Sequence, residues 1–202
     1  MPIEHESHWG LSEDDESADS LRGQLLIATP SIGDDRFSRT VIYLCAHNDE
    51  HAMGLILNKP MGALRLPDLL EQLGVKCSIQ VPDRPVRSGG PMEQDRGFVL
   101  HSDDFYLEDS TVRVGGGVGL TATKEILEAM GTSQGPRNTV LALGYAGWGP
   151  GQLENELRAN AWLLAPADMD LVFGDQLDGK WEGALGSIGV DPAMLSFQAG
   201  RA

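Results

Sequence analysis

Three short motifs in this chain place residue types at the spacing of known catalytic sites. The first, HNDEH over His47–His51, matches the H-x-x-E-H pattern of zinc proteases. That chemistry needs both histidines on one face of a helix and a third ligand from elsewhere. Here the five residues lie between two strand-like runs, so we interpret them as the polar tip of a hairpin.

The other two motifs also stand in the wrong context. GTSQG over Gly131–Gly135 has the letters of a nucleophile elbow, but it leaves a predicted helix and approaches a strand, the reverse of the order that such an elbow requires. GDQLDGK over Gly174–Lys180 has the glycine and lysine of a P-loop. Trp181 stands where a Ser or Thr would contact magnesium, and Asp175 and Asp178 would oppose the phosphates. We therefore predict neither a catalytic serine nor a phosphate site in these two segments.

A glycine-rich stretch over Arg87–His101 is harder to dismiss. Successive glycines before a proline allow a tight turn whose backbone N–H groups are exposed, and such turns can bind anions. Arg87, Arg96 and His101 add positive or titratable groups to this segment. The alternative interpretation is a type II turn between two strands, with His101 closing the end of one of them.

A second glycine-rich stretch runs over Gly144–Leu157 and has the order strand, turn, helix start, which often carries ligands. Glu154 and Glu156 lie in the first turns of that helix, where they complement its positive end and would oppose a phosphate. Trp148, among the glycines, is either a packing residue or a stacking surface.

We predict that a ligand, if there is one, binds where the sheet brings these two turns to one rim. The predicted site offers backbone N–H groups, one guanidinium and one indole face, which suit a small anionic or planar polar ligand. The competing interpretation is that the same residues only shape two tight turns and fill space. The candidate residues are Ser88, Gly89, Gly90, Arg96, His101, Trp148 and Gln152.

The elements that would position these residues alternate without a regular βαβ period, which favours an α+β fold. Apolar or β-branched runs predict the strands, and apolar residues at helical spacing predict the helices. The predicted strands are 24–29, 40–46, 53–57, 86–87, 97–100, 111–114, 139–145 and 171–173. The predicted helices are 66–73, 122–130, 152–161 and 177–185.

Length, charge and cysteine content limit the class of protein. The 202 residues, 41% hydrophobic and 22% charged, suffice for one packed domain. Residues 1–20 carry seven acids and no Lys or Arg, so removing them from the net charge of -15 leaves -8. We expect an acidic disordered leader over 1–21 and a single domain over 22–202. The negative charge argues against DNA binding.

Other features indicate where the protein works. No apolar run approaches the ~18 residues of a membrane helix, and the first basic residue is Arg22, which argues against a secretory signal. Two isolated cysteines, Cys45 and Cys77, suit a reducing compartment. We therefore expect a cytoplasmic protein with no membrane contact.

Three blocks of this sequence together resemble the bacterial AlgH/YqgE family. They are GQLLIATPSIGDDRFSRTVIYLCAHNDEHAMGLILNKP, SGGPMEQDRGFVLH and LGYAGWGPGQLENELRANAWLLAP, and the resemblance covers 23–197. It implies an α+β fold in which a β-sheet curls into a pseudo-barrel flanked by helices, as a single domain. The family has no established biochemical function, although the label of transcriptional regulator is attached to it. The resemblance implies no catalytic residues.

These observations leave three functional hypotheses. The first is a non-enzymatic regulatory domain that binds a small molecule or a protein partner. The second is an enzyme with an atypical site built from Asp34, Arg36, Arg96 and His101, if the fold brings them together. The third and weakest is a transcriptional regulator. We predict no cofactor and no metal.

Overall fold

The apolar runs predicted as strands lie side by side in one curled sheet of ten strands. The computed structural model describes residues 19–196. The strand order is β10-β1-β2-β3-β9-β6-β8-β7, with β4 attached through β5, which pairs with β9. The strands are β1 (Gln24–Ala28), β2 (Val41–His47), β3 (Ala52–Ile56), β4 (Pro60–Arg65), β5 (Pro85–Ser88), β6 (Met92–Ser102), β7 (Thr111–Gly115), β8 (Val118–Thr121), β9 (Thr139–Trp148) and β10 (Trp162–Pro166).

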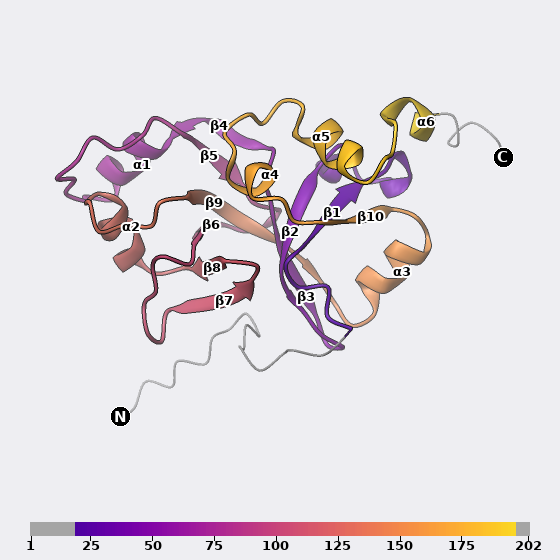
Figure 1. Ribbon diagram of the computed structural model, residues 1–202, viewed down its shortest axis with the longest axis horizontal. Helices are drawn as coiled ribbons and strands as arrows, with labels where there is room; N and C mark the ends of the chain where they lie inside the picture. The colour runs from indigo at the N-terminus through magenta and orange to yellow at the C-terminus, as the bar shows by residue number, and fades with distance from the viewer. Residues whose placement is uncertain (1–18, 197–202) are drawn as a thin grey trace.

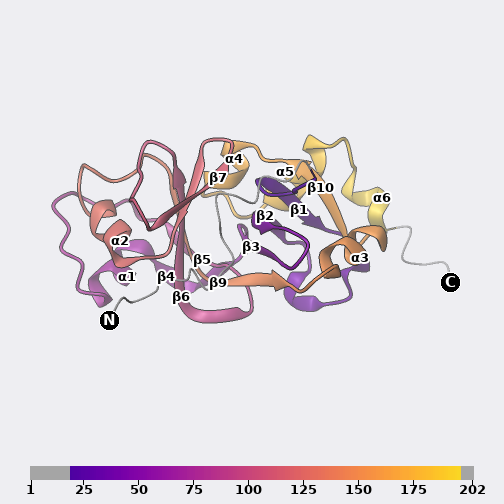
Figure 2. The same ribbon diagram turned by 90° about the horizontal axis from the view of Figure 1, so that it is seen from below.

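Short helices cover this sheet at its two ends and along one side. Figures 1 and 2 show α1 and α2 at one end of the molecule, α3 at the other, and α4 and α5 along one side. Two 3-10 turns, η1 (Pro30–Ile32) and η2 (Asp35–Phe37), connect β1 to β2. The helices are α1 (Leu66–Gln72), α2 (Lys124–Met130), α3 (Gln152–Arg158), α4 (Met169–Phe173), α5 (Lys180–Ser187) and α6 (Pro192–Ser196).

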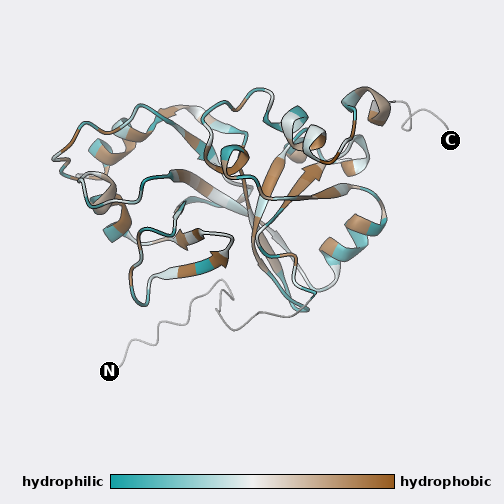
Figure 3. Ribbon diagram, in the orientation of Figure 1, coloured by the Kyte–Doolittle hydropathy of each residue, from teal (hydrophilic) through white to brown (hydrophobic). Residues whose placement is uncertain are grey.

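The central strands are buried on both faces. In β1, Leu25 and Ile27 pack into a core beneath α4 and α5, whereas Leu26 and Ala28 pack into a second core beside α3. Successive residues of a strand point to opposite faces, so burial of both faces requires an unbroken apolar run. This is why β1 and β2 are largely brown in Figure 3.

Strand β9 joins the two halves of the sheet. Its first residues pair with β6 and β5, and its last three pair with β3. Gly144 lies between these two stretches with a φ of 77°, which favours glycine. A Cβ atom at that position would also lie 2.5 Å from the carbonyl oxygen of Gly90. Glycine therefore permits both the turn in β9 and the close approach of the chain after β5.

Several predicted elements differ from the structure. The segment 171–173, predicted as a strand, lies in helix α4, because Asp168 caps that helix by accepting hydrogen bonds from the backbone N–H groups of Asp170 and Leu171. Residues 146–148, predicted as part of a turn, continue β9. Strands β4, β8 and β10 were not predicted. The proline that ends β10 is tolerated because β10 is an edge strand.

The prediction of a single α+β domain with a curled sheet flanked by helices is confirmed. The predicted leader over 1–21 falls mostly outside the described residues. Its last three residues are described, and two of them contact His47: the hydroxyl of Ser20 donates to the carbonyl of His47, and the backbone N–H of Leu21 donates to Nδ1 of His47. Among residues 19–196, no helix is long and apolar enough to cross a membrane.

Candidate functional site

The predicted glycine turn lies against the middle of β9. The backbone N–H of Gly89 donates to the carbonyl of Leu143, and its own carbonyl accepts from Ile56. A Cβ atom on Gly90 would lie 2.1 Å from the backbone of Tyr145. The two glycines thus allow one backbone to lie directly on another, and the N–H of Gly89 is committed within the sheet.

His101 is fully buried in the protein interior. Its Nδ1 bonds the carbonyl of Ser102 at 3.0 Å, and its Nε2 bonds the hydroxyl of Thr121 at 2.8 Å. Because a carbonyl can only accept, Nδ1 carries the proton and Nε2 accepts, which is the neutral ring. Burial is the main cause that lowers the pKa of His101 below its usual value. This is a histidine whose bonding capacity is already satisfied.

Trp148 and Gln152 meet at Glu156. The indole N–H groups of Trp148 and Trp162 donate to the same oxygen of Glu156, at 2.9 and 2.7 Å, while Gln152 donates to its other oxygen. The two indole rings also pack edge to face, with centroids 6.0 Å apart. Trp148 is buried, so its ring packs the core beside α3.

The structure brings some of the predicted site residues together and separates others. Gly90 and Arg96 both lie beside Tyr145, and Trp148 follows three residues along β9. His101 instead pairs with Thr139, at the start of β9. Nine residues of β9 separate that position from Trp148, and the two side chains have different neighbours: His101 bonds Thr121, whereas Trp148 packs in the core beside α3. His101 and Trp148 therefore do not line one small site.

The hairpin interpretation of His47–His51 is confirmed, since β2 and β3 pair on either side of a tight turn. His47 has a role that the sequence did not indicate. Its Nε2 bonds Glu154 of α3 at 2.6 Å while its Nδ1 accepts from Leu21. Burial opposes ionisation of Glu154, yet the bond from His47 and the helix backbone leave the pKa of Glu154 below its usual value.

A cavity of about 490 Å³ opens between the β1–β2 connection and helices α5 and α6. We call it the loop–helix cavity. Its volume lies in the range of small-molecule sites, ~300–1,000 Å³. Its lining residues are Ala28, Thr29, Pro30, Ile32, Gly33, Asp34, Asp35, Ser38, Arg39, Trp181, Pro192 and Ala193.

Local structure fixes the shape of this lining. Thr29 caps η1 and also donates to the carbonyl of Asn160, which anchors the loop to the turn after α3. Asp34 caps η2. On the other side, the indole N–H of Trp181 donates to the carbonyl of Ala28 at 2.8 Å, which holds α5 against the end of β1.

The residues around the loop–helix cavity carry an excess of negative charge. Asp34 forms an ion pair with Arg36, and this hydrogen-bonded partner lowers the pKa of Asp34, so its carboxylate stays ionised. Arg39 lies over the ring of Trp181, 4.6 Å from its centroid, and pairs with Glu182. Asp35 has no ion-pair partner among residues 19–196. The lining therefore presents one uncompensated carboxylate beside apolar walls.

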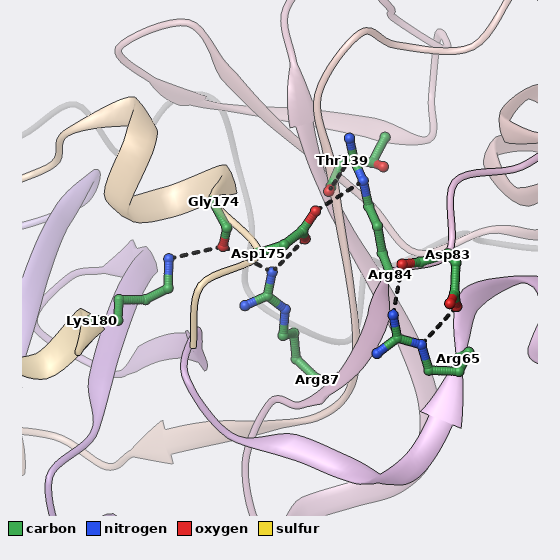
Figure 4. Close-up of polar contacts among 8 residues, drawn as sticks. All are labelled: Arg65, Asp83, Arg84, Arg87, Thr139, Gly174, Asp175 and Lys180. Atoms are coloured by element: carbon green, nitrogen blue, oxygen red, sulfur yellow. Dashed lines mark hydrogen bonds and ion pairs between the residues drawn. The ribbon is translucent and has the colours of Figure 1, made fainter. Parts of the chain in front are cut away.

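A second polar cluster lies where α4, α5 and β5 meet (Figure 4). Nη2 of Arg87 donates to the carbonyl of Gly174 and to Asp175, each at 3.2 Å, and Nη1 donates to the carbonyl of Leu57. Nε of Arg84 pairs with the other oxygen of Asp175 at 3.2 Å. Nζ of Lys180 donates to the carbonyls of Leu171 and Gly174, at 2.5 and 3.0 Å.

Two of these cations are almost inaccessible to solvent, with Arg87 1% and Lys180 4% exposed. Burial, the largest cause, and the neighbouring Arg87 lower the pKa of Lys180 to about 8. The sequence placed Lys180 in a rejected P-loop frame. That rejection agrees with the geometry, because Nζ points back to the end of α4 instead of into an anion cradle.

The sequence carried little signal for either feature. The loop–helix cavity combines 28–39 with 181–193, which are distant in the chain and have no motif in common. The hypothesis of an enzyme grouped Asp34 and Arg36 with Arg96 and His101, but Asp34 borders the cavity with Arg36 as its ion-pair partner, whereas Arg96 and His101 lie on β6. In the described part of the chain, no three His, Cys, Asp or Glu side chains are grouped as a metal site would need.

Comparison with known proteins gives consistent matches over nearly the whole chain. The sequence profile described as AlgH-like matches residues 25–193. A UPF0301 protein of Methylobacterium sp. (strain 4-46) is 55% identical over 193 residues, which are 92% of each chain. A UPF0301 protein of Caulobacter vibrioides (strain NA1000 / CB15N) is 52% identical, over 94% of this chain and 97% of its own.

Solved structures that are similar to this chain include the following two. The solution structure of the AlgH protein from Pseudomonas aeruginosa has a TM-score of 0.72 and 39% identity, and the match covers 92% of this chain and 98% of that one. A crystal structure of a Corynebacterium diphtheriae protein has a TM-score of 0.67 at 20% identity, over 86% of this chain and 90% of that one. The second likeness supports the fold alone.

Proposed function

We propose, from the premise that this chain belongs to the AlgH-like family, that it binds a small organic molecule in the loop–helix cavity and catalyses no reaction on it. One observation carries the proposal. The cavity has the volume of a ligand site and is walled by two segments distant in sequence, one of which supplies an unpaired carboxylate. Its partner is then a metabolite-sized molecule, and the role is regulatory.

The lining favours a ligand with a positive or hydrogen-bond-donating group on an apolar body. Asp35 offers a carboxylate that no cation of residues 19–196 neutralises. Ile32, Pro30 and Pro192 supply the apolar wall. A ligand amine near Asp35 would gain a charge-assisted hydrogen bond, whereas a ligand carboxylate would be repelled by both Asp34 and Asp35.

The same lining argues against acid–base catalysis. A catalytic acid or base needs a pKa near neutral pH, but the pKa of Asp34 is moved away from neutrality by Arg36. His101 lies elsewhere, in the interior. The second hypothesis, an enzyme around Arg96 and His101, rests on residues that the structure does not place with Asp34 and Arg36.

Ligand-observed NMR with three matched probes tests the proposal. Benzylamine, benzyl alcohol and benzoate share an apolar body and differ in their charged group. We expect saturation transfer in the order amine, alcohol, benzoate. Asp35→Asn should remove the preference for the amine, whereas Asp49→Asn, an exposed acid at the hairpin tip, should keep it.

A cavity-filling pair of variants supplies the control for location. Ala193 lines the loop–helix cavity, and Met194, its neighbour on α6, is 68% exposed and does not. Ala193→Phe should abolish binding of the amine, and Met194→Phe should leave it unchanged. Equal binding by both variants would show that the ligand does not bind in this cavity. The rim formed by Ser88, Gly90 and Arg96 would then be the next candidate site.

We also propose that the protein is cytoplasmic and does not bind DNA. Both cysteines are free, and Cys45 is buried among strands, which is compatible with a reducing compartment. The domain without its leader carries a net charge of -8, opposite in sign to the basic face that supplies non-specific DNA affinity. Gel-shift titration at low salt should show no retardation of duplex DNA below micromolar protein.

A further inference from the structure

The amine of Lys180 has the bonding environment of an uncharged nitrogen. Its two acceptors, the carbonyls of Leu171 and Gly174, match the two N–H groups of a neutral amine. No carboxylate of residues 19–196 lies within 4 Å of Nζ. The cationic form would leave one N–H without a partner and add a charge to a buried site.

The cluster around Lys180 contains more positively charged groups than negatively charged groups. Arg84, Arg87 and Lys180 bring up to three positive charges, and Asp175 brings a single negative one. Nζ of Lys180 and Nη2 of Arg87 donate to the same oxygen of Gly174, at 3.0 and 3.2 Å, so they lie within about 6 Å of each other. Nε of Arg87 is buried with no hydrogen-bond partner in the described residues. Buried charge without a counter-ion is costly.

We propose that Lys180 is a carbamylation site that takes up carbon dioxide reversibly. The lone pair of Nζ attacks the carbon of CO2 and forms an N–C bond, one C=O electron pair moves onto oxygen, and the nitrogen releases a proton to water. The side chain changes from a charge of +1, or from neutral, to -1. In this state Arg84 and Arg87 face Asp175 and the carbamate, so the cluster carries equal numbers of positive and negative charges.

The surroundings of Nζ select a small neutral reagent. Lys180 borders a surface hollow of about 400 Å³, but only 4% of the residue is exposed. Asp170 and Asp178 also line that hollow. They would repel a phosphate or a carboxylate and would not hinder CO2. Nη2 of Arg87 lies within about 6 Å of Nζ, so this guanidinium can donate to the carbamate oxygens and offset their repulsion by Asp170 and Asp178.

The pH dependence follows from the same groups. Carbamate formation requires the neutral amine, and burial with Arg87 from β5 brings the pKa of Lys180 to about 8, while Asp175 opposes this. Arg84 pairs with Asp175 and weakens that opposition, and the exposed Asp170 and Asp178 border the outer side. Occupancy should rise between pH 7 and pH 9, over a range where an ordinary lysine of pKa ~10.4 is still protonated.

Carbon-13 NMR of the full chain with ¹³C-labelled bicarbonate tests the proposal directly. The wild type at pH 8.5 should show a lysine carbamate signal that Lys180→Arg removes. Lys124→Arg, whose lysine is 62% exposed on α2, should keep it. The α-amino terminus of the protein used in the experiment forms a carbamate of its own, which both variants retain. Absence of a second signal in the wild type, or its persistence in Lys180→Arg, would overturn the proposal.

A second experiment uses the wild-type protein, so its result does not depend on whether the Lys180→Arg variant folds. Ethylation of carbamates with triethyloxonium under CO2, followed by peptide mass mapping, should place the trapped group on the peptide that contains Lys180. Trapping only on Lys59, Lys76 or Lys124 would refute the assignment. This outcome is separate from the fate of the loop–helix cavity, because the benzylamine experiments do not involve Nζ of Lys180.

Discussion

Replacing Lys180 by methionine should change how stability depends on pH. In the folded protein the pKa of Lys180 is lowered from 10.5 to about 8, chiefly by burial. Between these values the unfolded chain binds more protons than the folded one, so the free energy of unfolding rises with pH. At ~1.4 kcal/mol per pH unit, the wild type should gain about 3 kcal/mol relative to Lys180→Met from pH 7.5 to pH 10.5.

The difference in the free energy of unfolding between the wild type and Lys180→Met cancels the contributions of groups that titrate in both proteins. Burial raises the pKa values of Cys45 and Tyr43, so their ionisation in the unfolded chain destabilises both proteins above pH ~8.5. The absolute stability of the wild type can therefore remain flat while the difference grows. Urea unfolding followed by tryptophan fluorescence, in buffers free of CO2, measures both curves. Lys124→Met supplies the exposed control.

A difference that stays constant from pH 7.5 to pH 10.5 would refute the reasoning, because Lys180 would then titrate alike in the folded and unfolded states. A difference that falls with pH would mean that Lys180 is stabilised as a cation, by Asp175 or by another carboxylate. Either result would also weaken the case for a neutral amine at this site.

Three other stability measurements test the packing. Below pH ~6.5 the wild type should lose stability relative to His101→Gln, because the unfolded histidine gains a proton that the buried ring resists; parallel curves in acid unfolding would contradict this. Glu156→Gln should cost about 1–3 kcal/mol in urea unfolding, since one amide cannot accept both indole N–H groups and also the bond from Gln152; no loss would show that those bonds are replaceable. Gly90→Ala should lower the melting temperature sharply, because its Cβ meets the backbone of Tyr145, whereas Gly186→Ala on open α5 should raise it slightly. Equal shifts for the two glycine variants would refute the close-approach argument.

The sequence predicted the elements whose apolar pattern is strong and local. Residues 24–29, 40–46 and 139–145 became β1, β2 and β9 because both faces of these strands are buried and the apolar run is unbroken. The strand predicted over 171–173 was wrong because three apolar residues suit a strand or a helix turn equally. The helix cap from Asp168 favours the helix. β10 was missed because its proline is tolerated only at a sheet edge, which a local pattern cannot show.

The candidate site was less predictable because it depends on contacts between distant segments. Trp181 borders the loop–helix cavity through its bond to Ala28, 153 residues earlier in the chain. Glycines at 89 and 90 suggested exposed N–H groups, but the structure uses them to lay one backbone on another. The sequence around His101 does not show whether this residue contacts a ligand or lies in the core, because its hydrogen-bond partner Thr121 comes from another strand. Motif letters do not contain this information.

The most direct test of the proposed function is a ¹H–¹⁵N titration with benzylamine that follows the indole N–H of Trp181. This group lies at the wall of the loop–helix cavity and is bonded to Ala28. We expect saturable shifts of the Trp181 indole and of the amides of Gly33, Asp35 and Ser38, with Trp148 unmoved. Shifts confined to Gly90, Arg96 and Trp148 would contradict this and would locate the ligand at the rim around Gly90.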